Sequence, residues 1–371
     1  MRSCADAGLR VETNHCKHDA GRYNREIVSK TKFWIGRIFM RKVPFLDSLQ
    51  IIGRGSLNWK AGRPICVSFE VTDSCTAYCR HCDHGGPRDN SQNLKPADYR
   101  RYMEELQPCI VQVSGGEPLL RKDVVEVVRN IKQGARIPYI LFMSNWSLMT
   151  QEKYLELREA GIDQFNVSLD FPDERHDDFR KLPGLYSRLE KLVPRLAALG
   201  HDDIVLNCCI TSWNLPFINE LADKAKEWGV NLVYSSYSAR RTGCGDYSPS
   251  TPEHIRMLKQ QFEQVNARRD ETNYIVSTPA TLEQMLKFFE KGGTPGCKAG
   301  HRFLVVTSNG WLQPCSMVFE KYALEDRAKM VEEFTKTNTC DECYVAIRAN
   351  LDKTFPKLLW ENVSGYLSAK A

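Results

Sequence analysis

Three cysteines stand close together in the segment DSCTAYCRHCDHGG, which covers residues 73–86. Cys75, Cys79 and Cys82 are an odd number for disulfides, and a closed structural zinc site usually has four ligands. Cysteine thiolates are also the usual ligands of iron–sulfur clusters, and three of them on a four-iron cluster leave one iron free for an outside ligand. The spacing therefore indicates a metal centre that keeps one coordination position open.

A second group of cysteines follows near the C-terminal end of the sequence. Cys297 and Cys315 flank a segment that alternates in polarity like a β-hairpin, with Asn309-Gly310 as the expected turn. Cys340 and Cys343 follow in the motif CDEC. Four thiolates saturate a [4Fe-4S] cluster, and a zinc site is the alternative for the same donors. This group therefore predicts a second metal centre, one that is closed.

The composition is that of a globular protein. Of the 371 residues, 42% are hydrophobic and 26% are charged, which is sufficient for a sizeable core. The net charge of +5 is weak for a nucleic-acid partner, so none is expected. No apolar run reaches the roughly 18 residues of a membrane span. Residues 1–22 lack the apolar core of a signal peptide, so we expect a cytoplasmic protein whose 14 cysteines are reduced.

Short apolar segments rich in Val and Ile alternate with helical patterns through the middle of the chain. The expected strands cover residues 64–72, 110–114, 138–144, 164–170, 204–210 and 231–237. The expected helices between them cover residues 96–107, 121–134, 151–160, 185–199 and 214–228. This α/β alternation predicts a parallel sheet with helices outside, in a partial (β/α)6 TIM-like barrel. Chemistry in such folds lies at the C-terminal ends of the strands, where the first cysteine group lies.

The alternation stops after residue 245, and helices are expected at 252–268 and 280–291 ahead of the second cysteine group. We therefore predict three parts: an N-terminal tail and helical extension (1–60), a barrel core (61–245) and a small C-terminal hairpin and helix domain with its tail (246–371). Residues 24–53 mix bulky apolar and basic side chains in a helical pattern. They predict either a helix packed on the following domain or a peripheral contact with a membrane surface.

The spacing of Cys75, Cys79 and Cys82 resembles the signature of the radical S-adenosylmethionine (SAM) superfamily, and further motifs agree with that family in order and place. After the second expected strand, Gly115-Gly116-Glu117 resembles the family's GGE motif, which in relatives receives the amino group of SAM. The SAM contacts that the resemblance implies are Gly115, Gly116, Glu117, Ser144, Asn145, Ser168, Asp170 and Arg180. Among them Ser168 would bind the ribose and Arg180 the carboxylate, to which a guanidinium binds in bidentate fashion, with Asp170 as a supporting neighbour.

The same resemblance implies the chemistry. A reduced [4Fe-4S] cluster on the three cysteines would cleave SAM, and the 5′-deoxyadenosyl radical would abstract hydrogen from a substrate or add to it. The cofactor supplies this chemistry, and the protein orients and shields it. A low-potential electron donor of the flavodoxin or ferredoxin type is the implied partner.

The second cysteine group resembles the SPASM/twitch C-terminal extension of radical SAM enzymes. The full SPASM set needs cysteines beyond the position of Cys343, which is the last cysteine of this chain. The resemblance therefore implies the shorter twitch version, with one auxiliary [4Fe-4S] cluster on Cys297, Cys315, Cys340 and Cys343. Sulfatase-maturing relatives have a catalytic Asp directly after the cysteine that matches Cys315, and here Ser316 stands in its place. The catalytic residues, including a general base, are therefore unknown.

The favoured function is a radical SAM oxidoreductase or modifying enzyme whose auxiliary cluster assists an oxidation. The substrate alternatives are a peptide, a sugar or cyclitol, and a lipid, the last resting on the basic and apolar residues 24–53. A non-catalytic zinc-binding or scaffold protein is the alternative from another class. That alternative gives no purpose to the GGE motif, to Ser168 or to Arg180.

Overall fold

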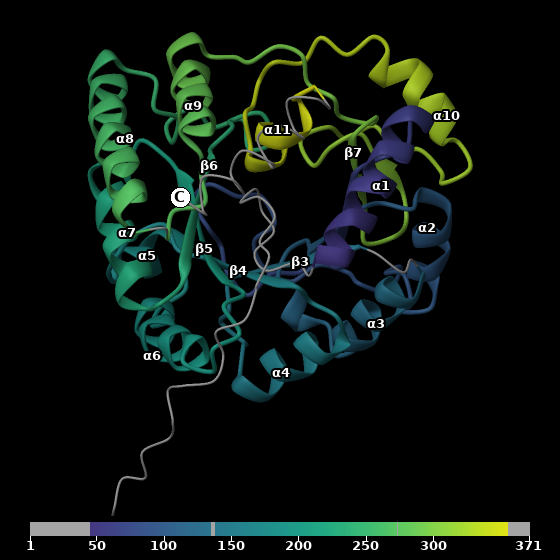
Figure 1. Ribbon diagram of the computed structural model, residues 1–371, viewed down its shortest axis with the longest axis horizontal. Helices are drawn as coiled ribbons and strands as arrows, with labels where there is room; N and C mark the ends of the chain where they lie inside the picture. The colour runs from purple at the N-terminus through teal and green to yellow at the C-terminus, as the bar shows by residue number, and fades with distance from the viewer. Residues whose placement is uncertain (1–44, 135–137, 273, 355–371) are drawn as a thin grey trace, which may run out of the picture. The chain divides into compact units, whose positions relative to one another are not determined.

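The computed structural model describes residues 45–134, 138–272 and 274–354. Helix α1 (Phe45–Ala61) comes first, and from β1 (Cys66–Glu70) onwards strands and helices alternate. Figure 1 shows the helices α3, α4, α6, α7 and α8 along the outer side of the strands. This is the layering that the strand–helix alternation of the sequence predicts.

Each of the six expected strands lies within its expected range. The strands after β1 are β2 (Ile110–Ser114), β3 (Tyr139–Ser144), β4 (Gln164–Ser168), β5 (Ile204–Ile210), β6 (Asn231–Ser236), β7 (Phe303–Val306) and β8 (Leu312–Gln313). The helices after α1 are α2 (Asp98–Leu106), α3 (Val124–Gly134), α4 (Gln151–Ala160), α5 (Arg175–Arg180), α6 (Leu185–Ala197), α7 (Ile218–Glu227), α8 (Pro252–Thr272), α9 (Pro279–Lys291), α10 (Arg327–Met330) and α11 (Ala346–Leu351). The short turns η1 (Pro118–Leu120), η2 (Leu215–Phe217) and η3 (Val331–Thr335) complete the set. Helix α5 was not expected from the sequence.

Among the described residues, the strands form one sheet in the order β6-β5-β4-β3-β2-β1-β7-β8. Strands β1 to β6 are parallel neighbours in chain order. The sheet is not closed, because β6 and β8 are its two edges. The predicted fold class, a partial (β/α)6 barrel, is confirmed in this form: a mostly parallel sheet that does not close into a barrel.

Side chains alternate between the two faces of each strand, and β1 shows the consequence. Val67 and Phe69 belong to the apolar core, together with one side of the covering helices. The residues between them and after them, Ser68 and Glu70, therefore face the inner side of the sheet. The inner face is thus the polar one. Because parallel strands end at the same edge, the loops after β1 to β4 come together there.

The segment that carries the second cysteine group joins the same sheet. Strand β7 pairs in parallel with β1 and antiparallel with β8. The turn between β7 and β8 contains Gly310, whose φ of 89° is a conformation that glycine adopts without strain. The Tyr102 hydroxyl of α2 donates a hydrogen bond to the Gly310 carbonyl over 2.7 Å. The hairpin expected at this turn is therefore present, while the domain boundary at residues 245 and 246 stays a prediction.

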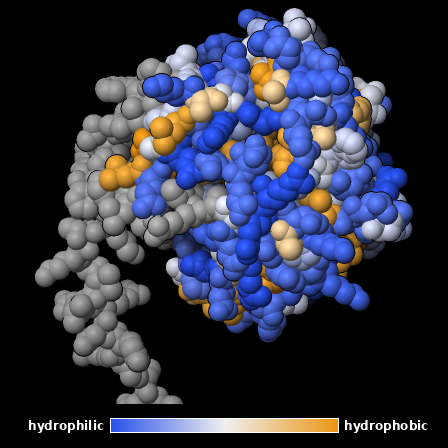
Figure 2. All heavy atoms as spheres, turned by 90° about the vertical axis from the view of Figure 1, so that its right-hand side faces the viewer, coloured by the Kyte–Doolittle hydropathy of each residue, from blue (hydrophilic) through white to orange (hydrophobic). Residues whose placement is uncertain are grey.

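In the parts of the chain that the structure describes, no helix is long and apolar enough to cross a membrane. Residues 24–44 of the segment with a predicted membrane contact lie outside the described residues. Helix α1, which begins at Phe45, exposes Leu49 and Leu57. Figure 2 shows the side of the molecule with α1, α2 and α10, where small hydrophobic patches interrupt a mainly hydrophilic surface. Scattered exposed apolar side chains of this kind are ordinary, so the membrane contact stays a prediction.

Candidate metal centres

The first cysteine group lies in the loop that leaves β1 at its C-terminal end. Cys75 and Cys79 are half-buried, and Cys82 is exposed. The Cys75 N–H donates to the carbonyl of Gly86 over 2.9 Å, so the loop folds back on itself around the three thiols. An exchangeable ligand can reach a site built in this way from solvent.

Helix α5 holds the outer part of this loop. The N–H groups of Tyr78 and Arg80 donate to the carbonyls of Arg180 and Phe179 over 3.2 and 3.0 Å. His81 stacks on the Phe179 ring, with the ring centroids 4.7 Å apart. The unexpected helix thus fixes the course of the chain between the second and third cysteines.

A buried ion pair stands directly behind the loop. Arg180 Nε and Nη2 lie 2.7 and 2.6 Å from Asp170 Oδ2, and Arg180 Nη1 lies 3.8 Å from Cys79 Sγ. Burial raises the pKa of the Asp170 carboxyl, but Arg180, the nearby histidines and the Cys209 N–H together outweigh it, so the pKa lies below its ordinary value. Asp170 Oδ1 also accepts from the Cys209 N–H over 3.0 Å. Ser168 is the half-buried last residue of β4, two positions before this pair.

Glu117 joins the ends of β2 and β3. Its side chain is fully buried and accepts three hydrogen bonds, from the Ser144 hydroxyl (2.7 Å) and from the N–H groups of Asn145 (2.8 Å) and Leu119 (3.0 Å). Burial raises the pKa of the Glu117 carboxyl, and these donors act against the increase. The carboxylate therefore positions two strand ends, while Ser114 to Gly116 remain half-buried at the edge of the site.

Asn145 carries the connection on to the cysteine loop. Its Nδ2 lies 3.0 Å from Thr76 Oγ1 and 3.9 Å from Cys75 Sγ. Its Oδ1 accepts from the Ser147 N–H over 2.9 Å, which fixes the orientation of the amide. The end of β3 is thus in direct contact with the first of the three thiols.

The two glycines of the GGE motif pack against the backbone that leads into the cysteine loop. A Cβ on Gly115 would lie 2.3 Å from the Thr72 carbonyl oxygen, and one on Gly116 would lie 2.1 Å from that of Ser74. Gly115 also has a φ of 123°, which L side chains rarely adopt. The close approach that these glycines permit is therefore, first of all, to the chain's own cysteine loop.

Two consecutive arginines after β6 link this loop to the second cysteine group, and the sequence analysis did not include them in the site. Arg241 Nε lies 2.5 Å from Asp83 Oδ1, and Arg241 Nη1 lies 3.6 Å from Glu70 Oε1. Arg240 pairs with Glu342, which stands between the last two cysteines. The only sequence signal for this link is the Arg-Arg pair at the end of a strand.

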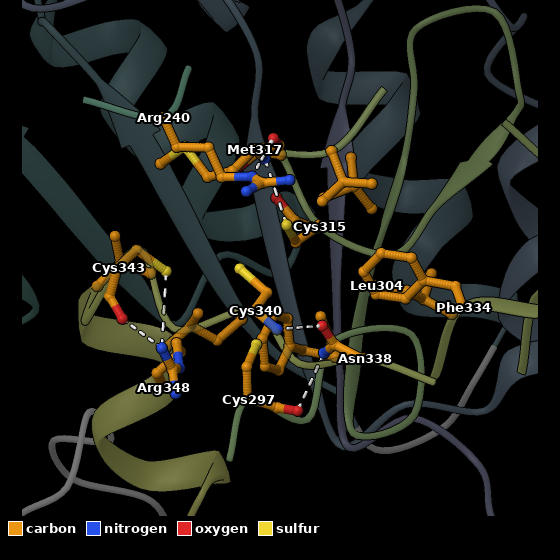
Figure 3. A pocket seen from close by; sticks show the side chains of 18 of the residues that line it. Arg240, Cys297, Leu304, Cys315, Met317, Phe334, Asn338, Cys340, Cys343 and Arg348 are labelled. Carbon is orange, nitrogen blue, oxygen red and sulfur yellow. Dashed lines mark hydrogen bonds between the residues drawn. The ribbon is translucent and has the colours of Figure 1, made fainter. Parts of the chain in front are cut away.

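The second cysteine group surrounds a cavity of about 70 Å³ (Figure 3). Cys297 precedes β7, Cys315 follows β8, and Cys340 and Cys343 precede α11. The cavity is lined by these four cysteines and by apolar side chains that include Leu304 and Phe334. Its volume is several times the roughly 10–15 Å³ that one water needs, so it has room for a larger group.

Local hydrogen bonds hold the second group of thiols in place. Asn338 donates from Nδ2 to the Cys297 carbonyl over 3.2 Å and accepts at Oδ1 from the Cys340 N–H over 3.0 Å. The Met317 N–H points at Cys315 Sγ over 3.4 Å. Burial raises the pKa of Cys297 to about 11 and that of Cys315 to about 12. Thiols with raised pKa values stay protonated at neutral pH unless a metal binds and displaces their protons.

Arg348 of α11 is a further residue that the sequence analysis missed. Its side chain is fully buried, and Nη1 lies 4.0 Å from Cys343 Sγ. Nη1 also donates to the Cys343 carbonyl, and Nε donates to Asp352 Oδ2 over 2.6 Å. Because a lone arginine on a short C-terminal helix carries no pattern, no feature of the sequence marks this one as buried.

The donors present fit iron–sulfur clusters at both positions. Soft thiolates are the ligands that such clusters take, and three and four of them match an open and a closed cluster. Among the described residues, no three His, Cys, Asp or Glu side chains come together tightly enough to hold a single ion. The four thiols of the second group line a common cavity, which a multi-iron cluster can occupy.

Comparison with known proteins agrees with this arrangement. The sequence model of the "Radical SAM superfamily" matches residues 69–225. The AdoMet-dependent heme synthases of Methanosarcina barkeri and Oleidesulfovibrio alaskensis are 28% and 25% identical to the chain; both matches cover 68% of it, and 76% and 70% of the relatives. The crystal structure of SuiB from Streptococcus suis bound to S-adenosylmethionine aligns with a TM-score of 0.59 and 18% identity, over 78% of this chain and 71% of SuiB. The structural likeness bears out the fold.

Proposed function

Since the chain is an enzyme of the radical SAM superfamily, we propose that Cys75, Cys79 and Cys82 hold the [4Fe-4S] cluster at which it cleaves SAM. When reduced, such a cluster supplies the electron that breaks the carbon–sulfur bond of SAM into methionine and a 5′-deoxyadenosyl radical. That radical abstracts hydrogen from the substrate or adds to it.

One observation carries this proposal: the end of β3 and the helix α5, which follows β4, both reach the cysteine loop through side chains. Asn145 approaches Cys75 Sγ to 3.9 Å, and Arg180 approaches Cys79 Sγ to 3.8 Å. Unrelated motifs would not converge on one cysteine loop. Their convergence favours a site in which the residues from several strands act on one ligand.

The roles of the chain's own residues follow from their positions. Ser168, half-buried at the end of β4, would bind the ribose of SAM, and Arg180 would bind its carboxylate while Asp170 holds the guanidinium in place. Glu117 is enclosed, so we assign the contact with the amino group to the half-buried backbone of Gly115 and Gly116. Ser144 and Asn145 complete the SAM site from the next strand.

At the second position, we propose an auxiliary [4Fe-4S] cluster on Cys297, Cys315, Cys340 and Cys343. Such a cluster supplies a place for one electron in an oxidation. The four thiols around one cavity support a cluster that the protein saturates, without an exchangeable ligand. Zinc at both positions, in a non-catalytic protein, is the competing proposal, and metal analysis separates the two.

The substrate and the electron donor are proposals of a coarser kind. Radical SAM enzymes need a reductant, and we propose a low-potential protein of the flavodoxin or ferredoxin type. A peptide, a sugar or cyclitol, and a lipid remain the substrate candidates. A structure of SuiB contains its precursor peptide SuiA, which supports the peptide, and the relatives named heme synthases add a haem precursor.

The test is anaerobic purification, cluster reconstitution, and an iron and sulfide count, followed by an assay of 5′-deoxyadenosine with dithionite and SAM. We expect about eight irons in the wild type and about four in Cys75→Ala/Cys79→Ala/Cys82→Ala, because each [4Fe-4S] cluster holds four. Only the wild type should release 5′-deoxyadenosine. Zinc in place of iron, or no SAM cleavage by the loaded wild type, would refute the proposal.

A further inference from the structure

Arg348 is the most enclosed charged side chain beside the second cysteine group. Its exposed fraction is 0%, although arginine is almost never fully buried unless it is paired. Its oppositely charged partner is Asp352, four residues further along the chain, whose side chain is 16% exposed. The pair repays part of the cost of removing a guanidinium from water.

The guanidinium has two differently used edges. One edge faces Cys343, with Nη1 at 4.0 Å from Sγ and bonded to the carbonyl of the same residue (Figure 3). The other edge faces Asp352, with Nε at 2.6 Å from Oδ2, and Nη2 donates to the Thr294 carbonyl over 3.0 Å. The positive charge therefore lies between the thiol and the carboxylate. The group that faces the sulfur is an N–H donor of the guanidinium.

Arg302 is a second arginine of the same region, whose bonds go to carbonyls and whose charge acts on Asp352. Its Nη1 donates to the carbonyls of Leu351 and Lys353 over 2.8 and 2.6 Å, and its guanidinium stacks on the Trp59 ring at 3.3 Å. Arg302 thus fastens the end of α11 by carbonyl bonds and stacking. Arg348 also binds carbonyls, but in addition it directs a donor and a charge at a cysteine sulfur.

We infer that Arg348 raises the reduction potential of the cluster that Cys343 helps to hold. The inference rests on the proposed auxiliary cluster. Reduction adds one negative charge to a cluster, and a nearby cation and an N–H donor to sulfur both stabilise the reduced form. In an enclosed, mainly apolar site this electrostatic effect is screened less than at a surface. Asp352 opposes this effect, because its negative charge disfavours the reduced cluster. The opposition is the weaker of the two effects, because Asp352 lies on the far side of the guanidinium.

The consequence is a second site suited to accept an electron. A cluster with a purely structural purpose needs only its four thiolates and gains nothing from a buried charge pair aimed at one of them. The polarity of the pair, with the cation on the sulfur side, favours the reduced state. The inference therefore deepens the proposed function towards oxidation chemistry.

The experiment is a redox titration, followed by electron paramagnetic resonance, of anaerobically reconstituted full-length protein. The variants are Arg348→Gln, Arg348→Lys and Asp352→Asn, with Arg302→Gln as the matched control. Arg348→Gln should lower the midpoint potential of the second cluster, with a change of about tenfold in its reduced-to-oxidised ratio at fixed potential, or about 59 mV for one electron. Arg348→Lys should recover part of the loss. Asp352→Asn should shift the potential upwards, and Arg302→Gln should change it less than Arg348→Gln does, because Arg302 directs its bonds at carbonyls and acts on Asp352 only through its charge.

The opposite signs separate electrostatics from structure. If the role of Arg348 were merely structural, the midpoint potentials of Arg348→Gln and Asp352→Asn would shift in the same direction or stay unchanged. Either result overturns the inference. If Arg348→Gln fails to bind the second cluster, the other two variants decide. Asp352→Asn should still raise the midpoint potential, and Arg348→Lys should lower it slightly. About four irons in the wild type would instead refute the second [4Fe-4S] cluster itself and this role with it. The full iron content with unchanged potentials refutes the role of Arg348 alone.

Discussion

The two cysteine groups are built on opposite principles. The first lies at the edge of the sheet, where Cys82 is exposed and side chains from the end of β3 and from α5 approach the other two thiols. The second lines a cavity beside β7 and β8, where Cys343 is buried and the other three cysteines are half-buried. The difference teaches that the same donor atom serves two purposes. Access decides whether a site can exchange a ligand, and enclosure decides how strongly nearby charges act on it.

The largest test of this comparison removes one site and leaves the other. Cys340→Ala/Cys343→Ala should lose about four irons, those of one [4Fe-4S] cluster, and still cleave SAM to 5′-deoxyadenosine. The reason is that the residues proposed for the SAM site lie at the ends of β2 to β4 and on α5, outside the second cysteine group. Iron and sulfide counts with a 5′-deoxyadenosine assay check the outcome. Loss of iron from both positions in this variant would show that the two sites are not independent.

The next test addresses the ion pair behind the open site. Asp170→Asn leaves Arg180 buried without its carboxylate and should lower the free energy of unfolding by about 3–5 kcal/mol. It should also weaken SAM binding, because the guanidinium loses its fixed orientation. Urea unfolding and SAM titration of the anaerobic protein measure the two effects. Glu156→Gln is the control, since Glu156 pairs with Lys153 at the surface of α4, and it should change neither. An Asp170→Asn protein as stable as this control would contradict the role of the pair.

A smaller effect is expected from the arginines that join the two regions. Arg241→Gln leaves Glu70 and Asp83 without their shared cation, at a cost of about 1–3 kcal/mol. A chelator should then remove iron faster from the first site than it does in the wild type. Arg240→Gln, which frees Glu342, should accelerate the loss of iron from the second. Electron paramagnetic resonance distinguishes the two clusters, and equal acceleration at both sites in either variant would refute the assignment of one arginine to each loop.

The smallest effect concerns the anchor of β1 ahead of the first cysteines. Arg121 donates to the Val71 carbonyl over 3.0 Å and pairs with Asp123 over 2.8 Å. Because the Asp123 side chain is 38% exposed, Asp123→Asn should cost only about 0.5–1 kcal/mol at neutral pH. Hydrogen bonds from Arg121 lower the pKa of Asp123 below its ordinary 3.8, so the contribution is complete above that pH and is lost as the pH falls through the lower folded-state value. Urea midpoints measure the difference, and one that grows below pH 3.8 would contradict the pairing.

Local patterns in the sequence were sufficient for the six strands and for the neighbours of the first cysteine group. The six strands were predicted because buried parallel strands are short apolar runs, and the motif residues follow them by only a few positions. Asn145 and Arg180 were assigned to the first site, and they lie against Cys75 and Cys79. Whether they bind SAM stays a prediction.

The features that the sequence did not predict all depend on contacts between distant segments. Arg348 shows no pattern along the chain, and only the tertiary fold makes it a buried neighbour of Cys343. The pairing of Arg241 with Asp83 joins residues 158 positions apart. Helix α5 is a single short segment between two loops, and its stability comes from its packing against the cysteine loop rather than from a periodic pattern.

The pairing of β7 with β1 has a consequence for how the chain folds. β1 is the first strand of the sheet to be synthesised, yet its second neighbour follows more than 200 residues later, at Phe303–Val306. Until the ribosome has released β7, one edge of β1 presents unpaired backbone groups that can bind the wrong strand. Pairings of such sequence separation also slow folding, because a long loop must close before the contact forms. β1, the strand that leads into the first cysteine group, is thus synthesised early but gains its second neighbour only after β7 has been synthesised.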